Sequence, residues 1–189
     1  YNLGLMYLNG DGIPQNVQKG VELLESSANS GNPLAQSRLG NMYSIGDHVD
    51  KNFSRAIELY EKASAQNDAE AQVNLGYMYD QGEGVEIDKQ KAFNLYNQAV
   101  QNGNSKALFN LAFMYENGVQ GVIQKDSRKA AELYQQAADK GVTQALFNLG
   151  LLYSKGNNGD FPINKTKAAQ LFEQGSNQGD PNATLNLAL

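Results

Sequence analysis

The chain has 189 residues, of which 41% are hydrophobic, so it is long and apolar enough to bury a substantial core. Its formal net charge is −5 and no run of lysine and arginine interrupts it, so we expect no nucleic acid partner. The absence of cysteine excludes a disulfide framework and a thiolate zinc site. No apolar stretch approaches the roughly 20 residues of a membrane span, so we expect no membrane insertion.

A short motif recurs along the chain with a nearly constant period. A leucine followed by Gly or Ala stands at Leu3, Leu39, Leu75, Leu111, Leu149 and Leu187, with spacings of 36, 36, 36, 38 and 38 residues. Alanine stands four residues before each of the last five leucines, and tyrosine four residues after each of the first five. Such a period is typical of stacked supersecondary units. We expect a single repeat domain of about five units, at 1–31, 32–67, 68–103, 104–141 and 142–179, with a partial sixth at 180–189.

Each unit predicts a pair of helices. Alanine, leucine and tyrosine at i, i+4 and i+8 lie on one face of a first helix, here called helix A, which ends at glycine pairs such as Gly82 and Gly84. An Asn or Asp then precedes a Lys or Arg by three residues, as an N-cap does, and begins a second helix, helix B. These caps are Asn16, Asn52, Asp88, Asp126 and Asn164, and the C′ residues that end helix B are Gly31, Asn67, Gly103, Gly141 and Gly179.

The pattern therefore predicts an all-α fold, an α-solenoid of antiparallel helix pairs wound as a right-handed superhelix. The small residue after each leucine is expected to let a neighbouring helix backbone approach closely. The two longer units should place their two extra residues in the loops between helices A and B, near 119–122 and 157–162. Since the chain begins and ends inside the motif, we expect a piece of a longer protein whose uncapped ends associate end to end.

The segment from Ala71 to Gly103 resembles the Sel-one-like repeats (SLR), a branch of the tetratricopeptide-like (TPR-like) solenoids. It matches the family pattern A-x-x-x-L-G-x-x-Y-x-x-G-x-G followed by D-x-x-K-A-x-x-L-Y-x-x-A and a closing glycine. The resemblance covers the whole chain, with departures such as His48 in place of a loop glycine and Gly20 in place of a helix B alanine. It implies scaffold or adaptor work in assembling complexes, since a repeat architecture by itself specifies no activity.

Residues for catalysis or metal binding are scarce. His48 is the single histidine, there is no cysteine, and the sequence has no phosphate-binding loop, dinucleotide-binding fingerprint or nucleophile elbow. We therefore expect no enzyme activity, no cofactor and no metal.

Apolar residues lie on the side of helix A that should face solvent. Positions two before and two after the leucine lie at about 160° and 200° from it on a helical wheel. In three units these positions hold Val73 and Tyr77, Phe109 and Phe113, and Phe147 and Leu151, whereas the second unit has Ser37 and Asn41. Because helix A lines the concave surface of TPR-like solenoids, these residues predict a surface that binds a partner. The alternative is that they pack against helix A of the next repeat.

An asparagine precedes most of the leucines, with Arg38 as the exception. An amide both donates and accepts hydrogen bonds and suits an extended peptide, although hydrogen bonds between repeats would also explain it. Arg38 could pair with a carboxylate. We predict a non-enzymatic scaffold or adaptor that binds a protein or peptide, the alternative being a structural spacer or self-assembling repeat array within a larger protein. The predicted contact residues are Arg38, Asn74, Tyr77, Phe109, Asn110, Phe113, Phe147, Asn148 and Leu151.

Overall fold

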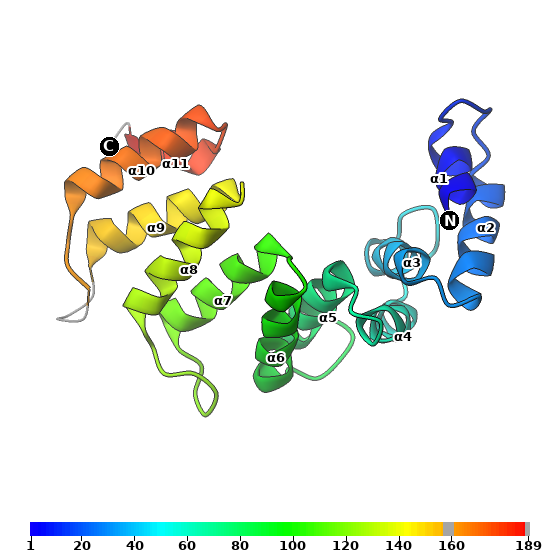
Figure 1. Ribbon diagram of the computed structural model, residues 1–189, viewed down its shortest axis with the longest axis horizontal. Coiled ribbons are helices and arrows are strands. Elements are labelled where there is room, and N and C mark those ends of the chain that lie inside the picture. Colours follow the sequence, from blue (N-terminus) through cyan, green and yellow to red (C-terminus); the bar gives the residue numbers. More distant parts are fainter. Residues whose placement is uncertain (157–160, 188–189) are drawn as a thin grey trace. The chain divides into compact units, whose positions relative to one another are not determined.

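The computed structural model describes residues 1–156 and 161–187, and within these ranges the chain is helical and has no β-strand (Figure 1). Consecutive helices pack in pairs, as predicted for an α-solenoid. The helices belong to two compact units, Tyr1–Gly103 (unit 1) and Asn104–Leu189 (unit 2).

Unit 1 contains three helix pairs. Its helices A are α1 (Asn2–Asn9), α3 (Pro33–Ile45) and α5 (Ala69–Gln81), and its helices B are α2 (Val17–Asn29), α4 (Phe53–Ser64) and α6 (Lys89–Gln101). Within unit 1, helices that are consecutive in the chain pack together, and α3 also contacts α5.

Unit 2 repeats the same arrangement. Its helices A are α7 (Ser105–Asn117), α9 (Thr143–Lys155) and α11 (Pro181–Leu187), and its helices B are α8 (Ser127–Asp139) and α10 (Lys165–Asn177). Consecutive helices pack together, and α9 also contacts α11.

The ends of helix B follow the local chemistry of the sequence. The side-chain oxygen of each predicted N-cap accepts the backbone N–H three residues later, at 2.8–3.0 Å. The predicted C′ residues all have positive φ, from 64° at Asn67 to 90° at Gly31. The loop between α7 and α8 spans 118–126 and takes the two extra residues of the fourth unit, as expected. In the fifth unit, residues 157–160 of the expected insertion lie outside the described residues.

The small residue that follows the repeated leucine of helix A makes room mainly for an aromatic ring. A Cβ on Gly40 would lie 2.6 Å from Cε1 of Tyr60, and one on Gly76 would lie 2.8 Å from the same atom of Tyr96. Among the described glycines at this position, only Gly4 would bring its Cβ close to a backbone atom, 3.1 Å from the Gly20 carbonyl oxygen, and this Cβ would lie equally close to a leucine side chain. The predicted close approach is therefore present, but helix B fills it with a side chain in most repeats.

Polar side chains also join neighbouring repeats of unit 1. Gln72 is 1% exposed, donates to the Ser64 carbonyl oxygen at 3.3 Å and accepts a hydrogen bond from Asn102 at 3.0 Å. Unit 2 has buried leucines, Leu108 and Leu146, at the equivalent positions. This polar link gave no recognisable signal in the repeat pattern.

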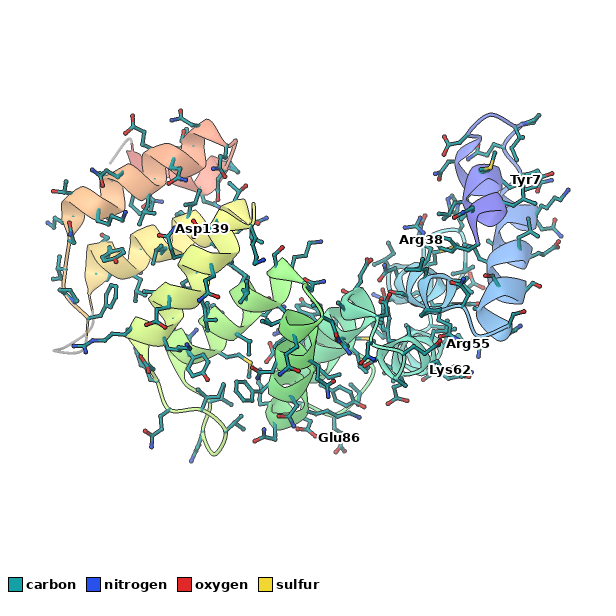
Figure 2. The ribbon with its side chains drawn as sticks, viewed as in Figure 1. Tyr7, Arg38, Arg55, Lys62, Glu86 and Asp139 are labelled. Atoms are coloured by element: carbon teal, nitrogen blue, oxygen red, sulfur yellow. The ribbon has the colours of Figure 1, made fainter. Side chains whose placement is uncertain are left out.

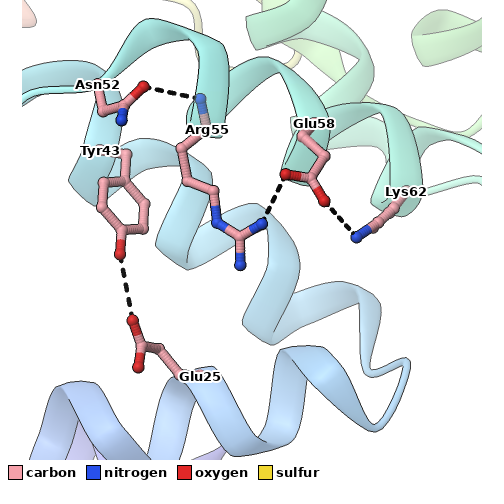
Figure 3. Close-up of polar contacts among 6 residues, drawn as sticks. All are labelled: Glu25, Tyr43, Asn52, Arg55, Glu58 and Lys62. Carbon is pink, nitrogen blue, oxygen red and sulfur yellow. Dashed lines mark hydrogen bonds and ion pairs between the residues drawn. The ribbon is translucent and has the colours of Figure 1, made fainter.

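A group of polar contacts spans α2, α3 and α4 (Figure 3). The Tyr43 hydroxyl on α3 donates to Glu25 on α2 at 3.1 Å, which ties the first repeat to the second. On α4, hydrogen bonds from Lys62 and Arg55, each 2.6 Å long, lower the pKa of Glu58. Because these three side chains are exposed or half-exposed, their ion pairs contribute little to stability.

Candidate functional site

Two hollows adjoin on the side of unit 1 formed by α1, α3 and α5, which we call the helix A face. The first hollow has a volume of about 340 Å³, and its lining includes Tyr1, Leu5, Leu34, Ser37, Asp68 and Glu70. The second has a volume of about 510 Å³, and its lining includes Ile45, Lys51, Tyr60, Asn74, Tyr77 and Glu83. Arg38 and Asn41 line both, so the two hollows are neighbours along α3.

Arg38 lies at the junction of the two hollows. Figure 2 shows it on α3, on the side away from Arg55 and Lys62 of α4. Its Nη2 atom is 3.7 Å from Oδ2 of Asp47, and 38% of its side chain is exposed. Its Nε atom is buried and has no hydrogen-bond partner among the described residues. This predicted site residue thus lies where the two hollows meet, and its Nε–H donates to no group among the described residues.

Asn41, which lines both hollows, links α3 to α4 and α5 through hydrogen bonds. Its Oδ1 atom accepts hydrogen bonds from the Tyr60 hydroxyl and from Nδ2 of Asn74, both at 2.6 Å. Its Nδ2 atom donates to Glu70 at 3.0 Å. Asn74, a predicted contact residue, therefore also links α5 to α3, and the sequence interpretation missed the central position of Asn41.

The aromatic residues on helix A divide into exposed and packed side chains. Tyr77 is 46% exposed beside the second hollow, and Phe113 is 53% exposed on α7. Phe109 packs against Tyr134 of α8, with ring centroids 5.6 Å apart. Phe147 packs against Phe172 in the same way, at 5.9 Å, and Leu151 is half-buried.

The helical wheel was therefore correct about solvent exposure at Tyr77 and Phe113. It was wrong at Val73, which is 7% exposed, and at Ser37, which is 3% exposed. The reason is that a helix carries neighbours on more than one side. At Phe109 and Phe147, which stand two residues before the leucine, the ring packs against an aromatic residue of helix B in the same pair.

The asparagines of unit 2 differ from one another. Asn148 on α9 donates to the Tyr134 hydroxyl of α8 at 3.3 Å, and that hydroxyl donates to Glu116 at 2.8 Å. Asn110 is half-buried, and within the described residues its side chain makes no hydrogen bond. Hydrogen bonds between repeats, the alternative explanation of the asparagine pattern, thus occur at Asn74 and Asn148.

Other kinds of site find no support in the described part of the chain. No group of three or more His, Asp or Glu side chains there is arranged to hold a metal ion. Among the described helices, none combines the length and the apolar character needed to cross a bilayer.

The Sel1 repeat family model matches the chain five times in succession, at residues 1–32, 33–68, 69–104, 105–142 and 143–180. A search of curated proteins found no significant match. The family match thus shows a repeat architecture and supplies no activity.

Solved structures of the same architecture resemble the chain over most or nearly all of its length. A protective antigen of uropathogenic Escherichia coli with an SLR fold is 32% identical over 98% of this chain, with a TM-score of 0.86. The chain spans only 39% of the length of that protein. A Sel1 repeat protein from Oxalobacter formigenes is 31% identical over 98% of this chain and 74% of its own, with a TM-score of 0.87. Cysteine-rich protein B of Helicobacter pylori is 28% identical over 72% of this chain and 96% of its own, with a TM-score of 0.54.

Proposed function

Because the chain belongs to the Sel1 repeat family, whose members are generally non-enzymatic protein-interaction scaffolds, we propose that it binds an extended segment of a protein partner on its helix A face. The surface includes the predicted contact residues Arg38, Asn74 and Tyr77, all of which belong to unit 1.

The observation that carries the proposal is the pair of hollows that adjoin along α3. Their shared boundary is polar, at Arg38 and Asn41, and the second hollow is bordered by Ile45 and Tyr77, which are 71% and 46% exposed. Polar groups between apolar borders suit an extended segment, whose main chain needs hydrogen-bond partners while its side chains need apolar contacts. Hollows of this size are in the range of ligand sites in proteins.

Unit 2 has an exposed aromatic ring of its own, Phe113, which is a separate candidate for contact with a partner. Aromatic residues provide large contact area with few rotatable bonds, and they are enriched among the residues that dominate binding energy. Phe109 and Phe147 contribute mainly through packing against helix B, so their role in binding is expected to be smaller.

The test separates affinity from stability. The probe is a peptide selected from a random display library on the intact chain, and the variants are Tyr77→Ala and Phe113→Ala. Because both side chains are about half exposed, each substitution should cost less than about 1 kcal/mol in urea unfolding. The binding free energy of the peptide should weaken by about 2 kcal/mol or more in the variant that lacks the ring which the peptide contacts.

Two further variants complete the experiment. Ile87→Ala removes a side chain that is 62% exposed in the loop between α5 and α6, and it should leave both quantities unchanged. Phe109→Ala should cost more stability than Tyr77→Ala or Phe113→Ala, because its ring is partly buried and packs against Tyr134. The proposal fails if no peptide is enriched, or if selected peptides bind Tyr77→Ala as tightly as the unaltered chain.

A further inference from the structure

The charge of the chain is divided unevenly between its two units. Residues 1–103 contain 13 acidic and 7 basic side chains, a net charge of −6, whereas residues 104–189 contain 7 acidic and 8 basic side chains, a net charge of +1. A ligand of unit 1 therefore meets a surface that attracts cations.

Two carboxylates line the first hollow at the start of α5. Asp68 is the N-cap of this helix and uses Oδ1 to accept the Ala71 N–H at 2.7 Å. Glu70 is exposed and accepts one hydrogen bond, from Asn41. Arg38 is the cationic side chain in the lining, but its Nη2 atom is directed to Asp47 in the loop after α3. The carboxylates of this hollow are therefore not neutralised by an ion pair with Arg38.

Ser37 gives a second and independent indication that the first hollow accepts a ligand. It is 3% exposed, it lines the hollow, and its hydroxyl has no hydrogen-bond partner among the described residues. Leaving a buried hydroxyl unpaired costs free energy. The equivalent residues of the next three repeats are larger, namely Val73, Phe109 and Phe147. The short serine leaves room in the hollow and an oxygen that can accept a hydrogen bond.

The rest of the lining of the first hollow consists of the asparagines Asn9 and Asn41 and an apolar part. Leu5 and Leu34 border it together with the Tyr1 ring, and Leu34 is 52% exposed. Lysine and arginine side chains bury their methylene stems along such surfaces while the charged end reaches a carboxylate, and an aromatic ring attracts the cation further.

We infer that the first hollow binds a lysine or arginine side chain of the partner segment, with its charged end at Glu70, Asp68 and the Ser37 hydroxyl. This inference rests on the proposed function and names the chemistry of the partner, a basic segment of a protein.

The first experiment determines the composition of the peptides that the intact chain selects from a random display library. Enrichment of lysine or arginine is the expected result. Enrichment of aspartate or glutamate would overturn the inference, would point to Arg38 as the binding group, and would leave the proposed function in place. If no peptide is enriched, the proposed function itself fails and the inference fails with it.

The second experiment locates the site with matched charge variants. Asp68→Asn combined with Glu70→Gln removes both carboxylates and keeps the N-cap, since Asn32 and Asn104 cap α3 and α7 at the equivalent position. Asp88→Asn combined with Glu86→Gln removes the same charge from unit 1 outside both hollows, and asparagine also caps α2 and α4. Fluorescence anisotropy with a selected basic peptide should show about a tenfold loss for the first pair and less than about twofold for the control pair.

A third variant tests the shape of the hollow without a change of charge. Ser37→Val introduces the residue of the third repeat, fills space in the hollow and should weaken binding of the basic peptide several-fold. The unfolding midpoint in urea reports whether the variant is folded. An equal loss of affinity in the two charge pairs would show attraction to the net charge alone and would overturn the inference. So would unchanged binding in both Glu70→Gln alone and Ser37→Val.

Discussion

Three buried tyrosines, Tyr60, Tyr96 and Tyr134, occupy the same position in helix B of consecutive repeats. They are at most 2% exposed, and the ring of each of the first two fills the space beside a glycine of helix A. Burial raises the pKa of each hydroxyl, and that of Tyr60 reaches about 12. The fifth repeat has Phe172 at this position, so the fold tolerates the ring without its hydroxyl.

These tyrosines should make the protein sensitive to alkali. A raised pKa means that the folded protein keeps its proton where the unfolded chain, with a pKa of about 10, has lost it. The stabilisation is therefore complete below about pH 10 and is lost as the pH rises from about 10 towards 12. For Tyr60, two pKa units correspond to about 2–3 kcal/mol of unfolding free energy. Urea unfolding at pH 8, 10 and 11 measures the loss.

Tyr60→Phe is the control for this prediction. At pH 8 it should cost about 1–2 kcal/mol, because Asn41 loses a hydrogen-bond partner. Above pH 10 its stability should fall less steeply than that of the unaltered chain, since one titrating group is gone. Parallel pH profiles for the two proteins would contradict the assignment of the alkaline loss to Tyr60.

At the scale of the element, helix B depends on its N-cap. Asp126 accepts the Lys129 N–H at 2.8 Å, and Asn or Asp does the same at the start of every helix B. Asp126→Ala should lower the free energy of unfolding by about 1 kcal/mol, because one N–H at the start of α8 loses its partner. Asp126→Asn should change it by less than about 0.5 kcal/mol, since asparagine caps α2, α4 and α10. If urea unfolding shows the same loss of unfolding free energy in both variants, the effect comes from the lost charge and not from the lost cap.

The elements were predictable because their signals are local. A cap such as Asn52 and a C′ residue such as Asn67 act on backbone groups a few residues away, so their spacing in the sequence locates the helix ends. The packing of Phe109 was not predictable in this way, since the ring that it contacts, Tyr134, belongs to another helix. The same holds for Gln72, whose hydrogen bonds reach helices before and after its own.

The candidate site depends both on local signals, which the sequence shows, and on contacts between helices, which it does not. The sequence indicated helix A, Arg38 and the exposed ring of Tyr77, because a helical wheel needs only the period of the helix. The first hollow depends on side chains from three helices A, and Ser37 marks it only when this serine is compared with the larger residues at the equivalent positions. A small residue in a position otherwise filled by Val or Phe was therefore the available signal.

At the scale of the whole molecule, packing is between helices that are close in sequence. Within each unit, a helix contacts its neighbours in the chain, and the additional contacts join helices A of adjacent repeats. In such arrays the stability is approximately a sum of terms for each repeat and for each interface between neighbours. A local defect should therefore have a local effect.

Leu146→Ala tests this expectation. Leu146 is fully buried on α9, so its truncation should cost about 2–5 kcal/mol. Hydrogen exchange should show the loss of amide protection in α8, α9 and α10, because these helices share the core that the leucine fills, while α1 to α3 should change by less than about 0.5 kcal/mol. Leu24→Ala, which truncates a fully buried leucine on α2, should produce the reverse pattern. If either substitution lowers protection equally in all helices, the chain unfolds as one cooperative body, and the energetic independence of its repeats must be abandoned.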